Sequence, residues 1–255
     1  PLTADSDPLA GITNSLGLPT PGGTNDASYY RDTKGSPDGM PDQNATFGGY
    51  YINAGAPAWW SILKGETIAT DGIAGLDELL RNTVGKALNC EGLFMDTTVT
   101  CAPNSFAAST YEWTNLGMQG LIERISTNYP GKILMANRGL FFFDPHYKQY
   151  AYSIRPYINM MMFESYFNDS NNGSGVTPFF PDNKYDLAPK INAEAGRPDG
   201  FNVVALDYNQ TPPLSQSIVD QSYQERMGIQ GWAHYRTDPS LTSAFNVNES
   251  IWLST

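Results

Sequence analysis

Residues 157–165 read YINMMMFES, an almost continuous apolar run that ends on the carboxylate of Glu164. A short apolar run without polar alternation is typical of a β-strand that is buried on both faces of a parallel sheet. Runs of the same form occur at residues 49–55 (GYYINAG), 92–98 (GLFMDTT), 132–139 (KILMANRG), 201–208 (FNVVALDY) and 228–235 (GIQGWAHY). The sequence therefore predicts six buried strands.

Amphipathic helical patterns separate these runs. Residues 73–88 place one set of apolar side chains on a single helical face, and residues 111–129 place a second set in the same way. The two sets are Ile73, Leu76, Leu79, Leu80, Val84 and Leu88, and Leu116, Met118, Leu121, Ile122 and Ile125. A third helix is predicted over residues 215–228, which open on a serine and close on a glycine.

Strands that alternate with helices indicate an α/β fold with a parallel sheet. No glycine-rich phosphate loop follows the first strand, so a (β/α)8 barrel of the TIM type is favoured over a doubly wound sheet. A complete barrel needs eight strands, and residues 1–49 do not obviously supply two more. The barrel is therefore either incomplete at its N-terminal end in this chain, or its first strands are cryptic.

The composition of the chain changes near residue 50. Glycine, proline, aspartate and asparagine recur throughout residues 1–49, which predicts an irregular N-terminal segment before a barrel domain over residues 50–255. Residues 36–42 (SPDGMPD) resemble acidic calcium-binding loops, but Lys34 stands where such loops usually place an acid. A plain turn is the favoured interpretation of this stretch.

Charge and composition narrow the function classes. The chain has a net charge of −11 and a pI near 4.5, which argues against nucleic acid and anionic membranes as partners. Few charged residues and many aromatic and amide side chains suggest a secreted, extracellular or cell-surface protein that handles carbohydrate. No stretch approaches the roughly 20 apolar residues of a membrane span. Without an initiator Met or a signal peptide, we expect a mature chain or part of a larger polypeptide or surface assembly.

The two cysteines, Cys90 and Cys101, flank the strand predicted at residues 92–98. Six extended residues span roughly 20 Å, whereas a disulfide joins Cα atoms about 4.4–6.8 Å apart. The sequence therefore predicts two free or half-buried thiols rather than a disulfide.

Polar side chains stand where the predicted strands end, and in a barrel these C-terminal ends form the active-site rim. We therefore expect a polar pocket built from Asn53, Asp96, Asn137, Arg138, Glu164, Asp207, Tyr208, His234, Tyr235 and Arg236. Several have a structural alternative: Asp96 as a turn residue, Glu164 as the ion-pair partner of Arg138 or Arg155, Asp207 as a helix cap, and His234 as a structural histidine. Aromatic side chains at the barrel mouth, Trp59 above all, could stack on sugar faces or belong to the core, as could Trp60 and Trp232.

Two carboxylates on a barrel rim suit glycoside hydrolysis. One acid protonates the leaving oxygen, and the other supports the oxocarbenium-like transition state. The apolar residues 160–163 remove solvent from Glu164, which favours its neutral form and predicts a proton donor. Asp96 is followed by Thr97 and Thr98, whose hydroxyls can hold it ionised. The sequence thus predicts Asp96 and Glu164 as a catalytic pair.

The segments GLFMDTTVT, KILMANRGL, INMMMFES and NVVALDY together resemble the endo-α-1,4-polygalactosaminidase-type glycoside hydrolases (family 114 and its relatives), which have a (β/α)8 barrel. The resemblance covers roughly residues 50–236, and FMDT and FES are its most specific parts. It implies that Asp96 is the nucleophile and Glu164 the general acid/base of a retaining, endo-acting enzyme. It also implies sugar-binding roles for Asn137, Asp207 and Tyr235, and a galactosamine-rich, partly N-acetylated α-1,4-linked polymer as substrate.

Two other classes of function are compatible with a barrel. A non-catalytic module that binds polysaccharide is supported by the irregular N-terminal segment and by residues 98–100 (TVT), which replace the second acid common after Asp-Thr in the family. A metal-dependent enzyme such as a polysaccharide deacetylase is disfavoured, because His146 and His234 are the only histidines and neither lies in a metal-binding motif. We therefore expect a polysaccharide partner and neither a metal nor a cofactor.

Overall fold

A computed structural model describes residues 11–13, 19–21, 54–65, 75–81, 88–96, 98, 113–169, 175–208 and 214–237. The chain divides into two compact units. The first unit comprises Pro1–Leu93, Thr98–Ile133 and Ala151–Tyr157, and the second comprises Phe94–Thr97, Leu134–Tyr150 and Ile158–Thr255. The predicted domain boundary at residue 50 and the stretch at residues 36–42 lie outside the described residues, so both stay predictions.

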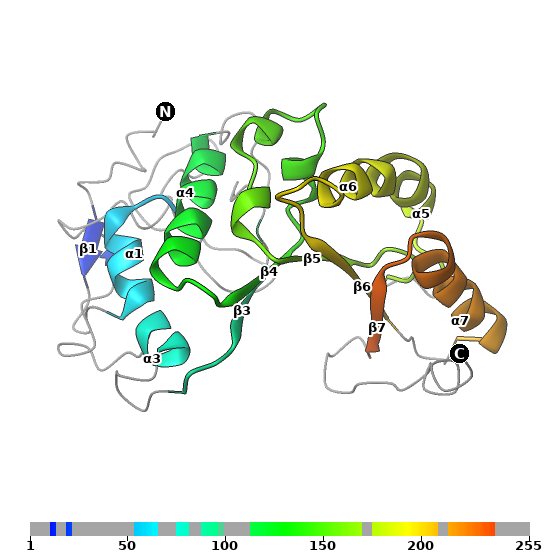
Figure 1. The fold of residues 1–255 in the computed structure, drawn as a ribbon, viewed down its shortest axis with the longest axis horizontal. Coiled ribbons are helices and arrows are strands. Elements are labelled where there is room, and N and C mark those ends of the chain that lie inside the picture. Colours follow the sequence, from blue (N-terminus) through cyan, green and yellow to red (C-terminus); the bar gives the residue numbers. More distant parts are fainter. Residues whose placement is uncertain are drawn as a thin grey trace. The chain divides into compact units, whose positions relative to one another are not determined.

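The main sheet has five strands in the order β3-β4-β5-β6-β7 (Figure 1). They are β3 (Gly92–Met95), β4 (Ile133–Asn137), β5 (Met160–Glu164), β6 (Asn202–Tyr208) and β7 (Ala233–Thr237). The pairs from β4 to β7 are parallel. The predicted α/β fold with a parallel sheet is confirmed, as are five of the six predicted strands. Of the sixth run, only Ala54 and Gly55 are described, and they form a turn.

Two of the three predicted helices are confirmed nearly in full. Residues 111–129 contain α4 (Trp113–Asn128), and residues 215–228 contain α7 (Gln216–Tyr223), which continues into the π-helical η7 (Gln224–Ile229). Ser215 caps α7, since its side chain accepts a hydrogen bond from the backbone N–H of Ile218. The third prediction is confirmed only over α3 (Leu76–Leu80), and residues 82–87 lie outside the description.

Three leucines assigned to the buried helical faces are exposed instead. Leu116 is 58% exposed because it precedes Met118 by two positions, which turns it to the far side of α4. Leu88 lies beyond α3, where helical periodicity no longer applies, and is also 58% exposed. Leu79 lies at the edge of its face. The other described members of the two sets, Leu76, Leu80, Met118, Leu121, Ile122 and Ile125, are buried.

Several short elements were not predicted from the sequence. A helical run follows β5 and consists of α5 (Phe180–Asp182), the π-helical η6 (Asn183–Leu187) and α6 (Ala188–Ala195). Prolines at the starts of α5 and α6 and a nearly polar sequence hide its amphipathic pattern. The others are α1 (Pro57–Lys64), the antiparallel pair β1 (Gly11–Thr13) and β2 (Pro19–Pro21), and the 3-10 helices η3 (Leu140–Phe143), η4 (Lys148–Tyr152) and η5 (Arg155–Tyr157).

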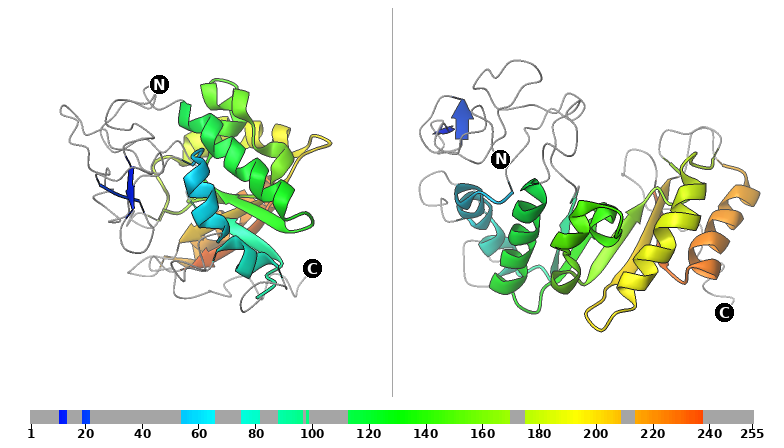
Figure 2. Two further views of the ribbon diagram at one scale, coloured as in Figure 1. Left: turned by 90° about the vertical axis from the view of Figure 1, so that its left-hand side faces the viewer. Right: turned by 90° about the horizontal axis from the view of Figure 1, so that it is seen from above.

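In the second unit, α6 and α7 lie along β5, β6 and β7 (Figures 1 and 2). Aromatic rings fill the space between them: Trp232 packs against Phe163 at 5.7 Å and against Tyr166 at 5.0 Å between ring centroids. Trp232 is buried, and its indole N–H donates to Asn192 Oδ1 at 2.7 Å. Of the two alternatives for Trp232, the core residue is therefore the correct one.

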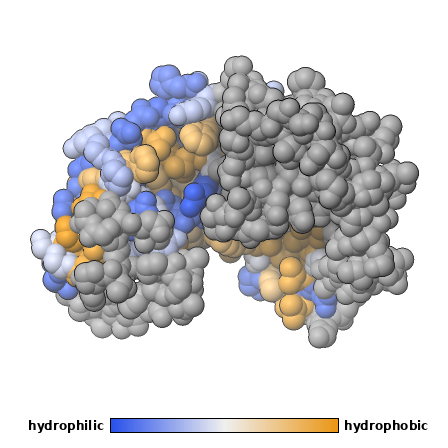
Figure 3. All heavy atoms as spheres, turned by 180° about the vertical axis from the view of Figure 1, so that it is seen from behind, coloured by the Kyte–Doolittle hydropathy of each residue, from blue (hydrophilic) through white to orange (hydrophobic). Residues whose placement is uncertain are grey.

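Hydrophobic and hydrophilic side chains alternate on the part of the surface coloured in Figure 3. Large apolar side chains are exposed at several described positions, among them Phe94, Phe179 and Tyr185.

Cys90 is an exposed free thiol, as predicted, and Cys101 lies outside the described residues. None of the helices in the described ranges combines the length and hydrophobicity that a membrane crossing needs.

Candidate active site

The side chain of Asn137 joins the two predicted catalytic carboxylates. Its amide nitrogen Nδ2 donates to Asp96 Oδ1 and to Glu164 Oε2, and each of these hydrogen bonds is 2.8 Å long. Asp96 directly follows β3, Asn137 ends β4 and Glu164 ends β5, so neighbouring parallel strands bring the three groups to one edge of the sheet. The predicted convergence of strand-end side chains is thus found for these three residues, all within the second unit.

The shared donor limits the distance between the carboxylates. An amide NH₂ group has two N–H bonds at roughly 120°, so two acceptors 2.8 Å from its nitrogen lie about 5 Å apart. Carboxyl groups separated by about 5–5.5 Å are typical of retaining glycosidases, whereas inverting enzymes keep about 6.5–9.5 Å for a water molecule. The spacing between Asp96 and Glu164 therefore matches the retaining arrangement.

Glu164 is held by two further donors. Tyr208 O–H donates to Glu164 Oε1 at 2.6 Å, and Arg138 Nε donates to Glu164 Oε2 at 3.0 Å. Burial alone would raise the pKa of Glu164, but the hydrogen bonds from Arg138, Tyr208 and Asn137 and the charge of Arg138 outweigh it and lower the pKa. The apolar residues before Glu164 predicted the opposite direction. That prediction is wrong because it considered burial alone and left out the donors, which come from the end of β4 and from β6.

The Tyr208 hydroxyl can be tested as a cause of this shift. In a Tyr208→Phe variant we expect the pKa of Glu164 to rise, because the ionised carboxylate loses its shortest hydrogen bond. Carbon-13 NMR titration of the glutamate carboxyls measures the change directly. Tyr185→Phe removes an exposed hydroxyl and should leave the pKa unchanged. An equal pKa of Glu164 in both variants and the wild type would contradict the assignment.

The backbone is strained immediately after two of the three strand-end residues. Arg138 follows Asn137 with a φ of 64°, and Ser165 follows Glu164 with a φ of 60°. Residues other than glycine adopt this left-handed conformation at a cost of about 1–2 kcal/mol. Backbone strain of this kind concentrates at functional sites, which supports this edge of the sheet as the functional one.

Comparisons with known proteins give limited similarity. No family model matches the chain, and no curated protein matches it. Among solved structures, the chain is similar to the glycoside hydrolase domain of PelA from Pseudomonas aeruginosa, with 20% identity and a TM-score of 0.49 over 80% of this chain and 70% of that chain. A variant of the same domain matches at 18% identity and a TM-score of 0.48, with the same coverage. Similarity at this level does not determine the activity of a chain, so its own side chains must carry the functional argument.

Strand alternation divides the remaining candidate residues between two faces of the sheet. Glu164 pairs in register with Leu206, and Leu206 with Tyr235. Because side chains alternate along a strand, Tyr208 shares the face of Glu164, whereas Asp207 and His234 point to the opposite face. Tyr235 is 42% exposed and belongs to the face of Glu164. The prediction that neighbours such as Asp207 and Tyr208 share one pocket is therefore wrong.

Asp207 belongs to a buried polar network on the helix-covered face. Its carboxylate accepts from the backbone N–H groups of Phe167 and Asn168 at 2.9 and 3.0 Å, and from the Ser222 hydroxyl at 2.7 Å. Arg226 Nε lies 2.9 Å from Asp207 Oδ2, and both side chains are fully buried. Asp207 therefore ties α7 and η7 to the segment after β5, and a sugar-binding role does not agree with this position.

Arg236 completes that network from β7, and His234 of the same strand lies on the same face of the sheet. Arg236 donates to Asn168 Oδ1 at 2.7 Å and to the Tyr208 carbonyl at 3.2 Å. Burial lowers the pKa of His234 to about 4, helped by the charge of Arg226, so its imidazole is neutral at neutral pH. The predicted rim positions of His234 and Arg236 are thus wrong, and the structural alternative for His234 agrees with this environment.

Asn53 lies outside the described residues, so its predicted role stays a prediction. Trp59 is part of α1 in the first unit, and its predicted sugar-stacking role also stays a prediction. Arg138 and Tyr208 were predicted to bind sugar, and the structure instead has them hydrogen-bonded to Glu164. Within the residues that the structure describes, no three His, Cys, Asp or Glu side chains gather as metal ligands.

Proposed function

We propose that the chain is a retaining glycoside hydrolase in which Asp96 and Glu164 form the catalytic pair. The observation that carries the proposal is the Asn137 amide nitrogen, which hydrogen-bonds both carboxylates and keeps them about 5 Å apart. A merely structural asparagine would not need two acids from neighbouring strands at one exposed edge. The proposal includes an extracellular or cell-surface location and a fold of the (β/α)8 barrel type, to which the five consecutive strands would belong.

In the first step, Asp96 attacks the anomeric carbon while Glu164 transfers its proton to the departing glycosidic oxygen. A bond from Asp96 to the sugar forms as the glycosidic bond breaks. In the second step, Glu164, now ionised, removes a proton from water, and the resulting hydroxide displaces Asp96. Two inversions at one carbon leave the product with the configuration of the substrate. Asn137, which donates to both carboxylates, holds the acids at the spacing that both steps require.

We further propose a cationic α-1,4-linked galactosamine polymer, partly N-acetylated, as the substrate. Free amino groups make such a polymer positive, and the chain carries a net charge of −11. Among the described side chains that are hydrogen-bonded at the site, the carboxylates of Asp96 and Glu164 stand against the guanidinium of Arg138, which leaves their summed charge negative when both acids are ionised. Long-range attraction therefore favours an amino sugar over an acidic one at this edge.

The test is covalent trapping. A 5-fluoro galactosaminyl fluoride should add one glycosyl group to the intact protein, and peptide mass mapping should locate it on Asp96. Asp96→Asn should abolish the adduct, whereas Asp182→Asn, an exposed carboxylate of α5, should leave it unchanged. In addition, proton NMR of polymer cleavage should show the α-anomer as the first product. A β-anomer, or a label on another residue, would overturn the retaining mechanism.

One observation favours a second candidate, a non-catalytic module that binds polysaccharide within a larger extracellular protein. The lowered pKa of Glu164 keeps this carboxyl ionised near neutral pH, and an ionised group cannot donate a proton. The same trapping experiment separates the two candidates. A binding module retains the polymer on an affinity column and forms no adduct at Asp96, at acidic as well as neutral pH.

A further inference from the structure

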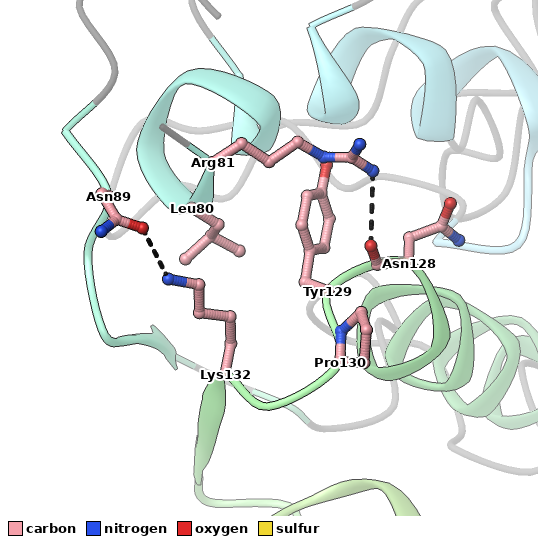
Figure 4. Close-up of a pocket in the computed structure, with 7 residues that line it drawn as sticks. All are labelled: Leu80, Arg81, Asn89, Asn128, Tyr129, Pro130 and Lys132. Atoms are coloured by element: carbon pink, nitrogen blue, oxygen red, sulfur yellow. Dashed lines mark hydrogen bonds between the residues drawn. The ribbon is translucent and has the colours of Figure 1, made fainter. Parts of the chain in front are cut away.

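A second candidate site lies within the first unit. A pocket of about 360 Å³ opens beside the segments that lead into β3 and β4 (Figure 4). Lys132 directly precedes β4 and Asn89 lies shortly before β3, while Leu80 and Arg81 come from the end of α3. A volume of this size falls within the range of about 300–1,000 Å³ that small-molecule sites occupy.

Charge distinguishes this pocket from the rest of the chain. The protein has a net charge of −11, yet the residues that line the pocket include two cations, Arg81 and Lys132, and no carboxylate. Arg81 is already engaged, because Nε lies 2.9 Å from Asp77 and Nη2 donates to the Asn128 carbonyl at 3.3 Å. These contacts hold the Arg81 guanidinium in place, and the carboxylate of Asp77 largely compensates its charge.

Lys132 differs from Arg81 in having no acidic partner among the described residues. Its ammonium donates to Asn89 Oδ1 at 3.0 Å, and this neutral amide is the one acceptor found for it within those residues. An ammonium group has three donors, so two stay available to a ligand. A cation that lines an open pocket without a counter-ion favours a bound anion, because a charge-assisted hydrogen bond is stronger than one between neutral groups.

The end of α4 does not account for Lys132. Cations near a helix C-terminus can offset its dipole, and Arg81 does so through the Asn128 carbonyl. The Lys132 ammonium is instead directed to Asn89, a side chain that precedes the neighbouring strand (Figure 4). The Lys132 ammonium is therefore available to a ligand in the pocket rather than bound to the carbonyl groups at the end of α4.

The other residues that line the pocket indicate what kind of molecule carries the anionic group. Figure 4 shows Leu80 and Lys132 on one side of the space and Tyr129 and Pro130 on the other. Tyr129 is fixed, since its hydroxyl donates to Asp77 at 2.8 Å and the Arg81 guanidinium lies 5.1 Å from its ring centroid. The exposed ring of Pro130, the amides of Asn89 and Asn128 and the uncompensated ammonium of Lys132 suit a sugar ring that carries a single negative charge.

We propose that this pocket binds a monosaccharide carboxylate, namely a uronic acid, with its carboxylate on the Lys132 ammonium and its hydroxyls within reach of Asn89. The site is independent of the carboxylate pair, and its ligand has the opposite charge to the amino sugar proposed there. One uncompensated ammonium matches one carboxylate, whereas a phosphate dianion would need further donors. The carboxylate could come from a free uronic acid or from the end of an acidic polysaccharide.

Calorimetric titration with galacturonic acid tests the proposal, with methyl galactoside, inorganic phosphate and trigalacturonic acid as further probes. We expect galacturonic acid to bind more tightly than the neutral sugar and phosphate, and the trimer to bind more tightly still if the natural ligand is a chain end. Lys132→Gln should weaken binding about tenfold or more, because one charge-assisted hydrogen bond is lost. Arg124→Gln, which removes an exposed cation of α4 outside the pocket, should not change it.

A measurement on the unmodified protein tests the proposal independently of whether the Lys132→Gln variant folds. Galacturonic acid should slow the acetylation of Lys132 in a mass-spectrometric amine-labelling experiment and leave Lys64 and Lys184 unaffected. Equal binding of the neutral sugar, tighter binding of phosphate, equal affinity of the two glutamine variants, or unaltered labelling of Lys132 would each overturn the proposal. None of these results depends on hydrolytic activity, so they leave the proposed function untouched.

Discussion

Replacement of Glu164 by glutamine is expected to lower kcat/KM on an α-1,4-linked galactosamine polymer by about 10³-fold, the contribution typical of a general acid/base. Glutamine keeps the shape of the side chain and can still accept from Arg138 or Tyr208, but it can neither donate nor accept the proton. Reducing-end assays on polymer measure the loss. Glu91→Gln, a change at an exposed position before β3, should retain full activity. Unchanged cleavage by the Glu164 variant would remove this residue from the mechanism.

The leaving group then distinguishes the roles of the two acids. An aryl glycoside with a dinitrophenol leaving group needs no protonation, so Glu164→Gln should lose much less rate on it than on the polymer. Asp96→Asn should be equally impaired on both substrates, because the bond to the anomeric carbon is still required. If Asp96→Asn were the variant rescued by the better leaving group, the two roles would be reversed.

The pH dependence follows from the environment of Glu164. As the proton donor, Glu164 must be protonated in the free enzyme, so kcat/KM should fall as the pH rises through its pKa. Because Arg138, Tyr208 and Asn137 lower that pKa, the optimum is expected at acidic pH. Tyr208→Phe raises the pKa and should move the alkaline limb to higher pH. A limb that stays in place would mean that another group supplies the proton.

The strands of the sheet could be predicted because each is an apolar run bounded by polar residues. The order of the five strands between residues 92 and 237 and the edge that carries Asp96, Asn137 and Glu164 followed from this pattern. The helical run after β5 could not be predicted, since Pro181 and Pro189 and many polar side chains mask its period. Tertiary packing, rather than local propensity, stabilises that run.

At the site, the main error of the sequence prediction was to assign all polar side chains at the strand ends to one face of the sheet. The sequence prediction placed Asp207 and Tyr208 in one pocket because both stand at the end of the same strand. Successive side chains of a strand point to opposite faces of the sheet, so these two residues do not share a pocket. The buried partners that decide the difference, Ser222 and Arg226, come from α7 and η7 and carry no signal near β6 in the sequence. The direction of the pKa shift at Glu164 was missed for a similar reason, because its donors come from other strands.

Replacement of Asp207 by asparagine is expected to destabilise the fold by about 3–5 kcal/mol, the cost of leaving buried cations without their counter-ion. Arg226 and Arg236 are both buried, and Asp207 is the carboxylate that faces them among the described residues. Urea unfolding monitored by tryptophan fluorescence measures the difference. Asp182→Asn, at an exposed site, should stay within about 0.5 kcal/mol of the wild type.

A double variant separates charge from packing in this network. When Arg226→Met accompanies Asp207→Asn, one uncompensated cation disappears, so the double variant should be more stable than Asp207→Asn alone. A double variant that is less stable would mean that Arg226 contributes mainly through its bonds to the Ser222 and Tyr235 carbonyls. Arg236 also donates a hydrogen bond to the Tyr208 carbonyl. We therefore expect loss of this network to displace the Tyr208 hydroxyl from Glu164 and so to raise the pKa of Glu164. The face of the sheet that carries Asp207 would then affect the protonation of Glu164 on the opposite face.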